Sequence, residues 1–211
     1  MTTIVLIAKE PLPGKAKTRL HPALTLEQAA GIAAASIDDT LTALANVPAT
    51  RRILAFDGNR LPPQSAGFEV LHQTSGNLDE RLGAIFDACD GPMVLIGMDT
   101  PQLTAADLAP AFSRWPDDID AWFGPANDGG FWALGMREPR GHLIRGVPMS
   151  QDDTGAHQLA RLREAGLRVG MLPSLTDVDT IDDAFEVAAL APETVFATTL
   201  ARFTRTTVLA A

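Results

Sequence analysis

A short segment near the N-terminus concentrates positive charge in a protein whose net charge is -9. A glycine lets a backbone approach a ligand closely, and lysine and arginine side chains can neutralise and grip phosphate oxygens. The segment is not a P-loop, because it lacks the first glycine and the final Ser/Thr of that motif. The basic segment therefore predicts a phosphate-binding site. The alternative is that it is only a basic turn exposed to solvent. The residues concerned are Lys9, Gly14, Lys15, Lys17 and Arg19.

A single carboxylate, Asp99, follows the most apolar segment of the chain, residues 92–98. A hard cation such as Mg²⁺ prefers carboxylate oxygens together with substrate phosphates and water. The alternative is that Asp99 only caps the turn before Pro101. Because the basic segment and Asp99 each follow a buried strand, we expect them to converge on one diphosphate. We therefore expect Mg²⁺ (or Mn²⁺) at Asp99, which is also a candidate catalytic residue.

Further carboxylates lie in two later segments. Asp128 stands in a turn rich in Gly, Asn and Asp, where it either shapes a plain hairpin or faces an acceptor substrate as a catalytic residue. Asp177 and Asp179 share one side of the chain if the backbone is extended. We expect Asp179 to be the second metal ligand and Asp177 its neighbour. The alternative is that the acids of this run complement the dipole of the next helix, which suffices for Asp182 and Asp183.

A loop before a predicted helix is a weaker candidate for contact with the nucleoside. Gly76 allows a close approach, and Arg81 lies on the helix itself. The alternative is that Ser75 or Asn77 caps this helix and that the loop has no other role. We expect Gly76 and Arg81 to contact the base or ribose.

The elements that must position these residues alternate between strand and helix patterns. This alternation predicts one α/β domain over residues 1–211, with a mostly parallel central sheet flanked by helices. In such sheets ligands bind beyond the carboxyl ends of the strands. Expected strands cover 3–8, 52–56, 68–72, 92–98, 121–123, 131–134 and 167–172. Expected helices cover 25–45, 78–88, 104–112, 153–165, 180–190 and 193–203.

Composition excludes several classes of function. With 26 acidic and 17 basic residues, the protein carries an excess of negative charge, which argues against DNA, RNA or an anionic membrane as a partner. Its apolar runs are far shorter than the roughly 20 residues of a membrane helix. The one cysteine, Cys89, allows no intramolecular disulfide, and we expect it to be a small buried apolar residue. We expect a cytoplasmic protein whose partner is a small-molecule nucleotide.

Taken together in order, five motifs resemble a glycosyltransferase-A-like bacterial family often labelled arsenosugar-biosynthesis glycosyltransferase. The chain is more distantly similar to phospholactate guanylyltransferase and to the molybdenum-cofactor guanylyl- and cytidylyltransferases. The resemblance extends to about residue 190. The motifs are Lys9-x-Pro-x-Pro-Gly-x-x-Lys17-Thr18-Arg19-Leu20, Gln73-x-x-Gly-x-Leu-x-x-Arg81, Gly97-x-Asp99-x-Pro101, Gly124-Pro-x-x-Asp128-Gly-Gly and Asp177-x-Asp179-Thr180.

The resemblance implies a nucleotide-diphospho-sugar transferase fold, with Lys17 and Arg19 on the phosphates and Asp99 on the metal. Two positions depart from the family: Phe131 replaces a usual tyrosine, and Met149 replaces a usual tryptophan. Because this fold hosts more than one reaction, alternatives stay open. The first is metal-dependent glycosyl transfer from a nucleotide-diphospho-sugar. The second is nucleotidyl transfer to a phosphorylated acceptor, and the third is nucleotide binding without turnover.

Overall fold

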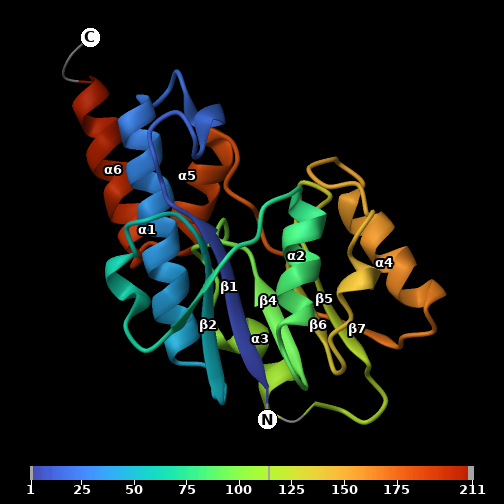
Figure 1. The fold of residues 1–211 in the computed structure, drawn as a ribbon. Helices are drawn as coiled ribbons and strands as arrows, with labels where there is room; N and C mark the ends of the chain where they lie inside the picture. Colours follow the sequence, from blue (N-terminus) through green and yellow to red (C-terminus); the bar gives the residue numbers. More distant parts are fainter. Residues whose placement is uncertain (1, 114, 209–211) are drawn as a thin grey trace.

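The computed structural model describes residues 2–113 and 115–208, and a seven-stranded sheet forms its centre (Figure 1). The strands are β1 (Thr3–Lys9), β2 (Arg51–Asp57), β3 (Glu69–His72), β4 (Met93–Ile96), β5 (Ala121–Pro125), β6 (Phe131–Met136) and β7 (Val169–Met171). Their order is β3-β2-β1-β4-β6-β5-β7. Neighbouring strands are parallel except where β6 pairs with β4 and β5. This is the mostly parallel α/β architecture that the alternating pattern predicted.

Local sequence explains where the helices begin. Thr25 caps the first helix through a capping box with Gln28, as the sequence predicted. Asn77 caps the second helix through a similar box with Glu80. The helices are α1 (Leu26–Ala45), α2 (Leu78–Asp87), α3 (Ala105–Phe112), α4 (Thr154–Glu164), α5 (Ile181–Leu190) and α6 (Val195–Val208). Short 3-10 turns are η1 (Thr18–Leu20), η2 (Pro63–Ser65) and η3 (Gly141–Leu143).

Several predicted segments need corrected bounds: the strand expected over 92–98 covers only Met93–Ile96, and those expected over 121–123 and 131–134 run to Pro125 and Met136. The strand expected over 167–172 pairs only over Val169–Met171, opposite residues 121 to 123 of β5. The helix expected over 193–203 begins at Val195 and runs to Val208. Its start is set by Thr194 and by Asp39 on α1, whose oxygens accept the first free N–H groups.

Each face of the sheet carries its own apolar core. One core joins inward side chains of β1, β2 and β4 to α1 and α3. The other joins the opposite side chains of the same strands to α2, η3 and α4. Because both faces are covered, the central strands are almost continuously apolar. Cys89 is buried in the second core, as expected.

A third apolar cluster lies at one side of the molecule, where α5 and α6 pack beside α1 (Figure 1). Val178, at the start of the segment that leads into α5, is completely buried in it. This packing fixes the position of its two acidic neighbours, Asp177 and Asp179. No helix in the described part of the chain is long and apolar enough to cross a membrane.

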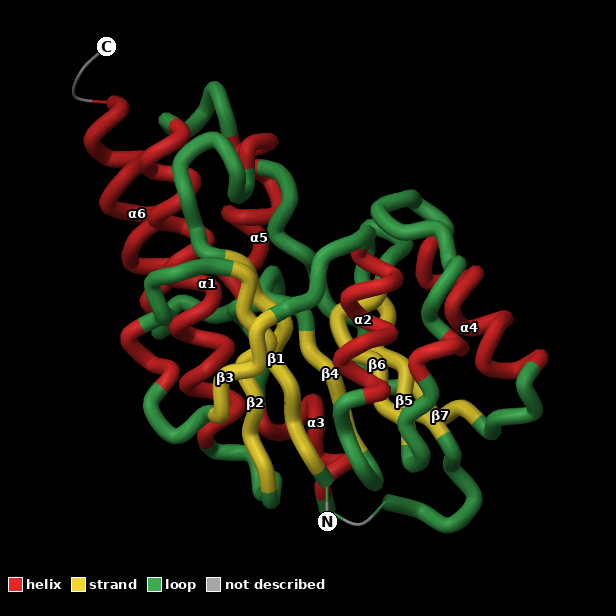
Figure 2. The backbone as a smooth tube through the Cα atoms, viewed as in Figure 1, coloured by secondary structure: helices red, strands yellow, loops and turns green. Residues whose placement is uncertain are grey.

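The carboxyl ends of β1 and β4 lie next to each other, because these two strands are parallel neighbours with Leu6 opposite Ile96. Figure 2 shows long loops gathered above this edge of the sheet, on the side opposite the N-terminus. The basic segment leaves β1 here, and the segment that carries Asp99 leaves β4. The topology therefore brings the two predicted segments to one place.

Candidate active site

A cleft of about 510 Å³ opens beyond the carboxyl ends of β1 and β4. Segments far apart in the chain contribute to it: the end of β1, η1, Gln73 with the start of α2, the segment after β4, the β5–β6 turn, residues 149–154, and the segment before α5. A smaller pocket of about 170 Å³ lies beneath the basic segment and shares residues with the cleft. The cleft is large enough for a small-molecule ligand.

Tight local turns shape the basic segment. The carbonyl of Leu12 accepts hydrogen bonds from the N–H groups of Lys15 and Ala16, at 3.0 and 3.2 Å. Gly14 has φ +74°, a conformation that favours glycine. Lys17 also adopts left-handed backbone geometry, φ 49°, immediately before η1. This turn directs the Lys17 side chain inward, while Lys15, Thr18 and Arg19 face the solvent.

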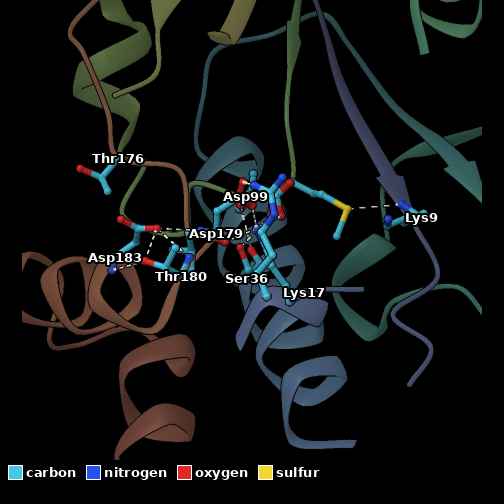
Figure 3. Close-up of polar contacts among 12 residues, drawn as sticks. Lys9, Lys17, Ser36, Asp99, Thr176, Asp179, Thr180 and Asp183 are labelled. Atoms are coloured by element: carbon cyan, nitrogen blue, oxygen red, sulfur yellow. Dashed lines mark hydrogen bonds and ion pairs between the residues drawn. The ribbon is translucent and has the colours of Figure 1, made fainter. Parts of the chain in front are cut away.

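The Lys17 ammonium lies among carboxylates (Figure 3). Its Nζ is 2.6 Å from Oδ1 of Asp99 and 3.6 Å from Oδ1 of Asp179, and it donates to the carbonyl of Val178. The side chain is only 5% exposed. Burial alone would lower the pKa of Lys17, but the charge and hydrogen bond of Asp99, with the charges of Asp177 and Asp179, raise it overall. Lys17 is therefore a buried cation.

The acidic segment before α5 is held against the segment after β4. The N–H of Val178 donates to the carbonyl of Asp99 at 3.0 Å. Burial, followed by the negative charge of Asp99, raises the pKa of Asp177 to about 7. Thr180 caps α5 in a box with Asp183, one of the later acids of this run.

Three other basic side chains around the cleft and the smaller pocket are more exposed than Lys17. Arg19 is 73% exposed and contacts Asp179, with 2.9 Å between Nη1 and Oδ2. Lys9 lines both the cleft and the smaller pocket, and Lys15 lines the smaller pocket. Within the described residues, neither lysine forms an ion pair, so both ammonium groups are available to an anionic ligand.

A polar network at the start of α2 supports Arg81. The Gln73 amide donates to the carbonyls of Ala8 and Ala55, at 2.8 and 2.9 Å, and its oxygen accepts from Nη1 of Arg81 at 3.0 Å. Arg81 also lies 3.7 Å from Asp57. Gln73 thus ties β1, β2 and α2 together at the cleft. Sequence reasoning placed it in a motif but assigned it no structural role.

Asp128 both shapes the β5–β6 turn and lines the cleft. Oδ1 of Asp128 accepts the N–H of Gly130 at 2.8 Å, and the residue lines the cleft. Gly129 has φ +86°, and a Cβ there would lie 1.8 Å from the carbonyl oxygen of Asp152. The N–H of Gly155 donates to the carbonyl of Gly129 at 2.8 Å. The turn is therefore locked onto residues 152–155.

Most of the residues singled out from sequence come together here. Those that line the cleft are Lys9, Arg19, Arg81, Asp99, Asp128, Asp177 and Asp179, and those that line only the smaller pocket are Lys15 and Lys17. Gly14 and Gly76 line neither. Gly76 has φ +115°, and a Cβ would lie 2.3 Å from Oε2 of Glu80, so both glycines serve backbone turns.

Sequence reasoning missed the cleft residues around Asp152. Asp152 and Met149 lie on the segment before α4 and line the cleft. In the sequence, only Met149 drew attention, because it departs from the family pattern. Asp152 looks like an ordinary acidic residue that precedes a helix. Only the packing of this segment onto Gly129 shows that it belongs to the site.

The carboxylates of Asp99 and Asp179 converge on one cation, the Lys17 ammonium, so their donor set suits a positive ion. Among the described residues, no three His, Cys, Asp or Glu side chains are grouped to hold a metal. Two carboxylates still fit Mg²⁺, since this ion commonly takes only one or two carboxylates and completes its shell with phosphates and water.

The model of a bacterial family, described as "Uncharacterized protein conserved in bacteria (DUF2064)", matches residues 38–151, more than half of the chain. A comparison with curated proteins finds no match. A protein from Desulfovibrio desulfuricans G20, assigned provisionally as a nucleotide-diphospho-sugar transferase, has a similar structure. The TM-score is 0.81 at 24% identity, and the match covers 97% of each chain.

Two nucleotidyltransferases are more distant in structure. The 2-C-methyl-D-erythritol 4-phosphate cytidylyltransferase from Thermus thermophilus has a TM-score of 0.56 at 16% identity, over 91% of this chain and 100% of that one. The CMP:2-keto-3-deoxy-manno-octonic acid synthetase, solved with CTP, has a TM-score of 0.57 at 14% identity, over 91% and 98%. At these identities, the likeness establishes a shared fold.

Proposed function

The chain belongs to the bacterial family described as uncharacterized, DUF2064, and from that premise we propose that it is a transferase whose donor is a nucleotide-diphospho-sugar. One observation carries the proposal. Lys9 at the end of β1, Arg19 on η1, and the carboxylates of Asp99 after β4 and Asp179 before α5 border a single cleft at the carboxyl edge of the sheet. Opposite charges around one cleft suit a ligand that combines an anionic diphosphate with a polar group to be transferred.

Each part of the site has a role in the proposal. Lys9, Lys15 and Arg19 bind the diphosphate and stabilise the negative charge that develops as it departs. Arg81 lies beside the nucleoside. Asp99 and Asp179 hold Mg²⁺ or Mn²⁺, which would supply further neutralisation of the diphosphate.

The transfer itself needs one base near the acceptor. An acceptor hydroxyl forms a bond to the anomeric carbon of the sugar, and the bond from that carbon to the diphosphate oxygen breaks. The electron pair leaves with the nucleoside diphosphate, and the hydroxyl proton passes to Asp128. The resemblance to glycosyltransferases of arsenosugar biosynthesis supports this form of the reaction.

Nucleotidyl transfer is a second candidate, favoured by the shared fold with the cytidylyltransferases. In that reaction the basic segment would hold the β- and γ-phosphates of a nucleoside triphosphate. A phosphorylated acceptor would attack the α-phosphate, and pyrophosphate would leave.

Ligand-induced thermal stabilisation separates these reactions. The protein is heated with Mg²⁺ and, in turn, each nucleoside triphosphate and each common nucleotide-sugar. A ligand at 100 times its dissociation constant adds about 2.7 kcal/mol of stability. Preferential stabilisation by one nucleotide-sugar is expected, and preference for a triphosphate would favour the second candidate. Release of nucleoside diphosphate with an acceptor would exclude binding without turnover. If no nucleotide raises the melting temperature, the proposal is wrong.

Two variants test the assigned residues. Arg19→Ala should weaken nucleotide binding about ten- to a hundredfold, since a charge-assisted hydrogen bond contributes about 1.5–3 kcal/mol. Arg163→Ala, an exposed base on α4 that lines neither pocket, is the matched control. Asp99→Ala should abolish the stabilisation that depends on Mg²⁺. Unchanged metal dependence in that variant would contradict the metal assignment.

A further inference from the structure

Charge is unevenly distributed around the cleft, whose lining also includes Asp99, Asp177 and Asp179, after β4 and before α5. The bases that line it are Lys9, Arg19 and Arg81, and all three lie on the side built from β1, η1 and α2. The opposite side is built from the β5–β6 turn and residues 149–154. Its charged lining groups are Asp128 and Asp152, and no described Lys, Arg or His lines the cleft on that side. We call these two sides the basic side and the acidic side.

The two carboxylates of the acidic side are available to a ligand. Asp128 uses Oδ1 for the N–H of Gly130, and no described residue donates to its Oδ2. Asp152 is exposed and has no side-chain partner among the described residues. Neighbouring bases on α4 and in the segment after η3 are turned to other groups. Arg145 pairs with Asp87, and His157 contacts Asp153.

An apolar wall completes this part of the cleft. Leu78 and Leu82 contribute from α2, and Phe131 and Met149 from the acidic side. The Phe131 ring is held by Phe123, with 5.6 Å between centroids, and it presents no polar atom. A ligand here therefore meets carboxylates and apolar surface together.

We propose that the acceptor of the transferase is an uncharged or cationic molecule that carries hydroxyl groups beside an apolar portion, and that it is not a phosphate monoester. The inference rests on the proposed function and names its second substrate. Carboxylates accept hydrogen bonds from hydroxyl and ammonium groups, whereas a phosphate dianion beside Asp128 and Asp152 would be repelled. Apolar ligand surface is buried against Leu82, Phe131 and Met149.

The test compares three defined probes on the full chain in the presence of Mg²⁺ and the stabilising nucleoside diphosphate. Glucosamine carries a cation, phenyl glucoside has an apolar end, and glucose 6-phosphate is a phosphate monoester. Dissociation constants are measured by NMR titration. Glucosamine and phenyl glucoside should each bind at least tenfold more tightly than glucose 6-phosphate. Equal or tighter binding of glucose 6-phosphate, or no binding of any probe, would overturn the proposal.

A charge reversal keeps the test specific to the cleft. Asp152→Lys should shift the ratio of glucose 6-phosphate to glucosamine affinity by at least tenfold toward the phosphate. Asp153→Lys makes the same change in net charge one residue away, at a side chain that faces His157 and does not line the cleft. It should leave the ratio unchanged. Equal shifts in the two variants would show a general field effect and contradict the inference.

Failure of this inference is separable from failure of the proposed function. Thermal stabilisation by a nucleotide-sugar depends on the basic side and reports the donor alone. A protein that binds the donor but prefers glucose 6-phosphate would retain the transferase proposal and lose the acceptor inference. A protein that binds no nucleotide would lose both.

Discussion

At the scale of single residues, the central feature is a lysine that occupies the space among three carboxylates. Lys17 is nearly buried and contacts Asp99 directly, and the charges of Asp177 and Asp179 also raise its pKa. A buried ion pair is not by itself stabilising, but removing one partner leaves the other uncompensated. Lys17 is therefore a positioning residue in the free protein and stands where a metal ion would share the same oxygens.

Lys17→Met should destabilise the protein by about 2–3 kcal/mol, somewhat below the full effect of breaking a buried pair, because Asp99 is one-third exposed. Added Mg²⁺ should restore more stability to this variant than to the wild type, since it replaces the missing cation. Urea denaturation with Mg²⁺ or with EDTA measures both effects. Lys15→Met, which removes an unpaired lysine, is the control. Equal responses to Mg²⁺ in all three proteins would contradict the shared-cation interpretation.

The raised pKa of Asp177 predicts a pH dependence of stability. Its value of about 7 in the folded protein exceeds the value of about 3.9 expected for an unfolded aspartate. The folded state therefore binds this proton more tightly, and the resulting stability is present at low pH and lost as the pH rises through about 7.

Asp177→Asn removes this titration while keeping a similar shape. In EDTA, the variant should be more stable than the wild type at pH 8, and the advantage should shrink by pH 5. Thermal denaturation at the two pH values measures the difference. A constant difference between the proteins at both values would show that Asp177 does not titrate in this range.

At the scale of elements, the β5–β6 turn is held in place by the segment that precedes α4. The contact is backbone to backbone: Gly155 donates to Gly129, and the carbonyl of Asp152 lies where a Gly129 side chain would begin. This contact places Asp128 and Asp152 beside each other at the cleft. The hairpin character of the turn could be predicted from its Asp-Gly-Gly sequence. The segment that packs against the turn, residues 152–155, could not be predicted, because a packing contact between distant segments leaves no local sequence pattern.

Gly129→Ala should destabilise the protein by more than the strain of a positive φ alone, about 1–3 kcal/mol, and should weaken acceptor binding. Gly67→Ala is the matched control, because Gly67 has φ +85° but a Cβ there would meet nothing within 4 Å. The difference in the free energy of unfolding between the two variants isolates the collision with Asp152. Equal destabilisation would show that the turn can move away without loss.

At the scale of the whole molecule, the protein combines a net charge of -9 with a small cluster of bases at one cleft. Duplex DNA carries a dense row of phosphates, and affinity for it depends on many basic contacts. We therefore expect the protein to offer too few such contacts and to repel DNA over the rest of its surface.

Fluorescence anisotropy with a labelled DNA duplex at about 50 mM salt, where phosphate contacts are strong, should therefore detect no binding. A nucleotide-sugar added at the same ionic strength should still raise the melting temperature, which shows that the basic cluster is functional. Micromolar DNA binding that weakens with salt would contradict this prediction.

The sequence by itself determined the class of fold and the start of several helices. These features depend on local patterns: alternation of apolar strands with capped helices, and pairs such as Thr25 with Gln28. The sequence also placed the basic segment and Asp99 each after a buried strand and predicted that they converge. The structure brings them together because those two strands are parallel neighbours.

Only the tertiary structure decided which residues each charge meets. From the sequence, Lys17 was predicted to bind phosphate, whereas the fold buries its ammonium among the carboxylates of Asp99 and Asp179. A backbone contact with the turn at Gly129 positions Asp152 at the cleft. Such partners are far apart in the chain, and their distances follow from how helices and loops pack on the sheet. No local spacing encodes that packing, so the division of the cleft into a basic and an acidic side emerged only in three dimensions.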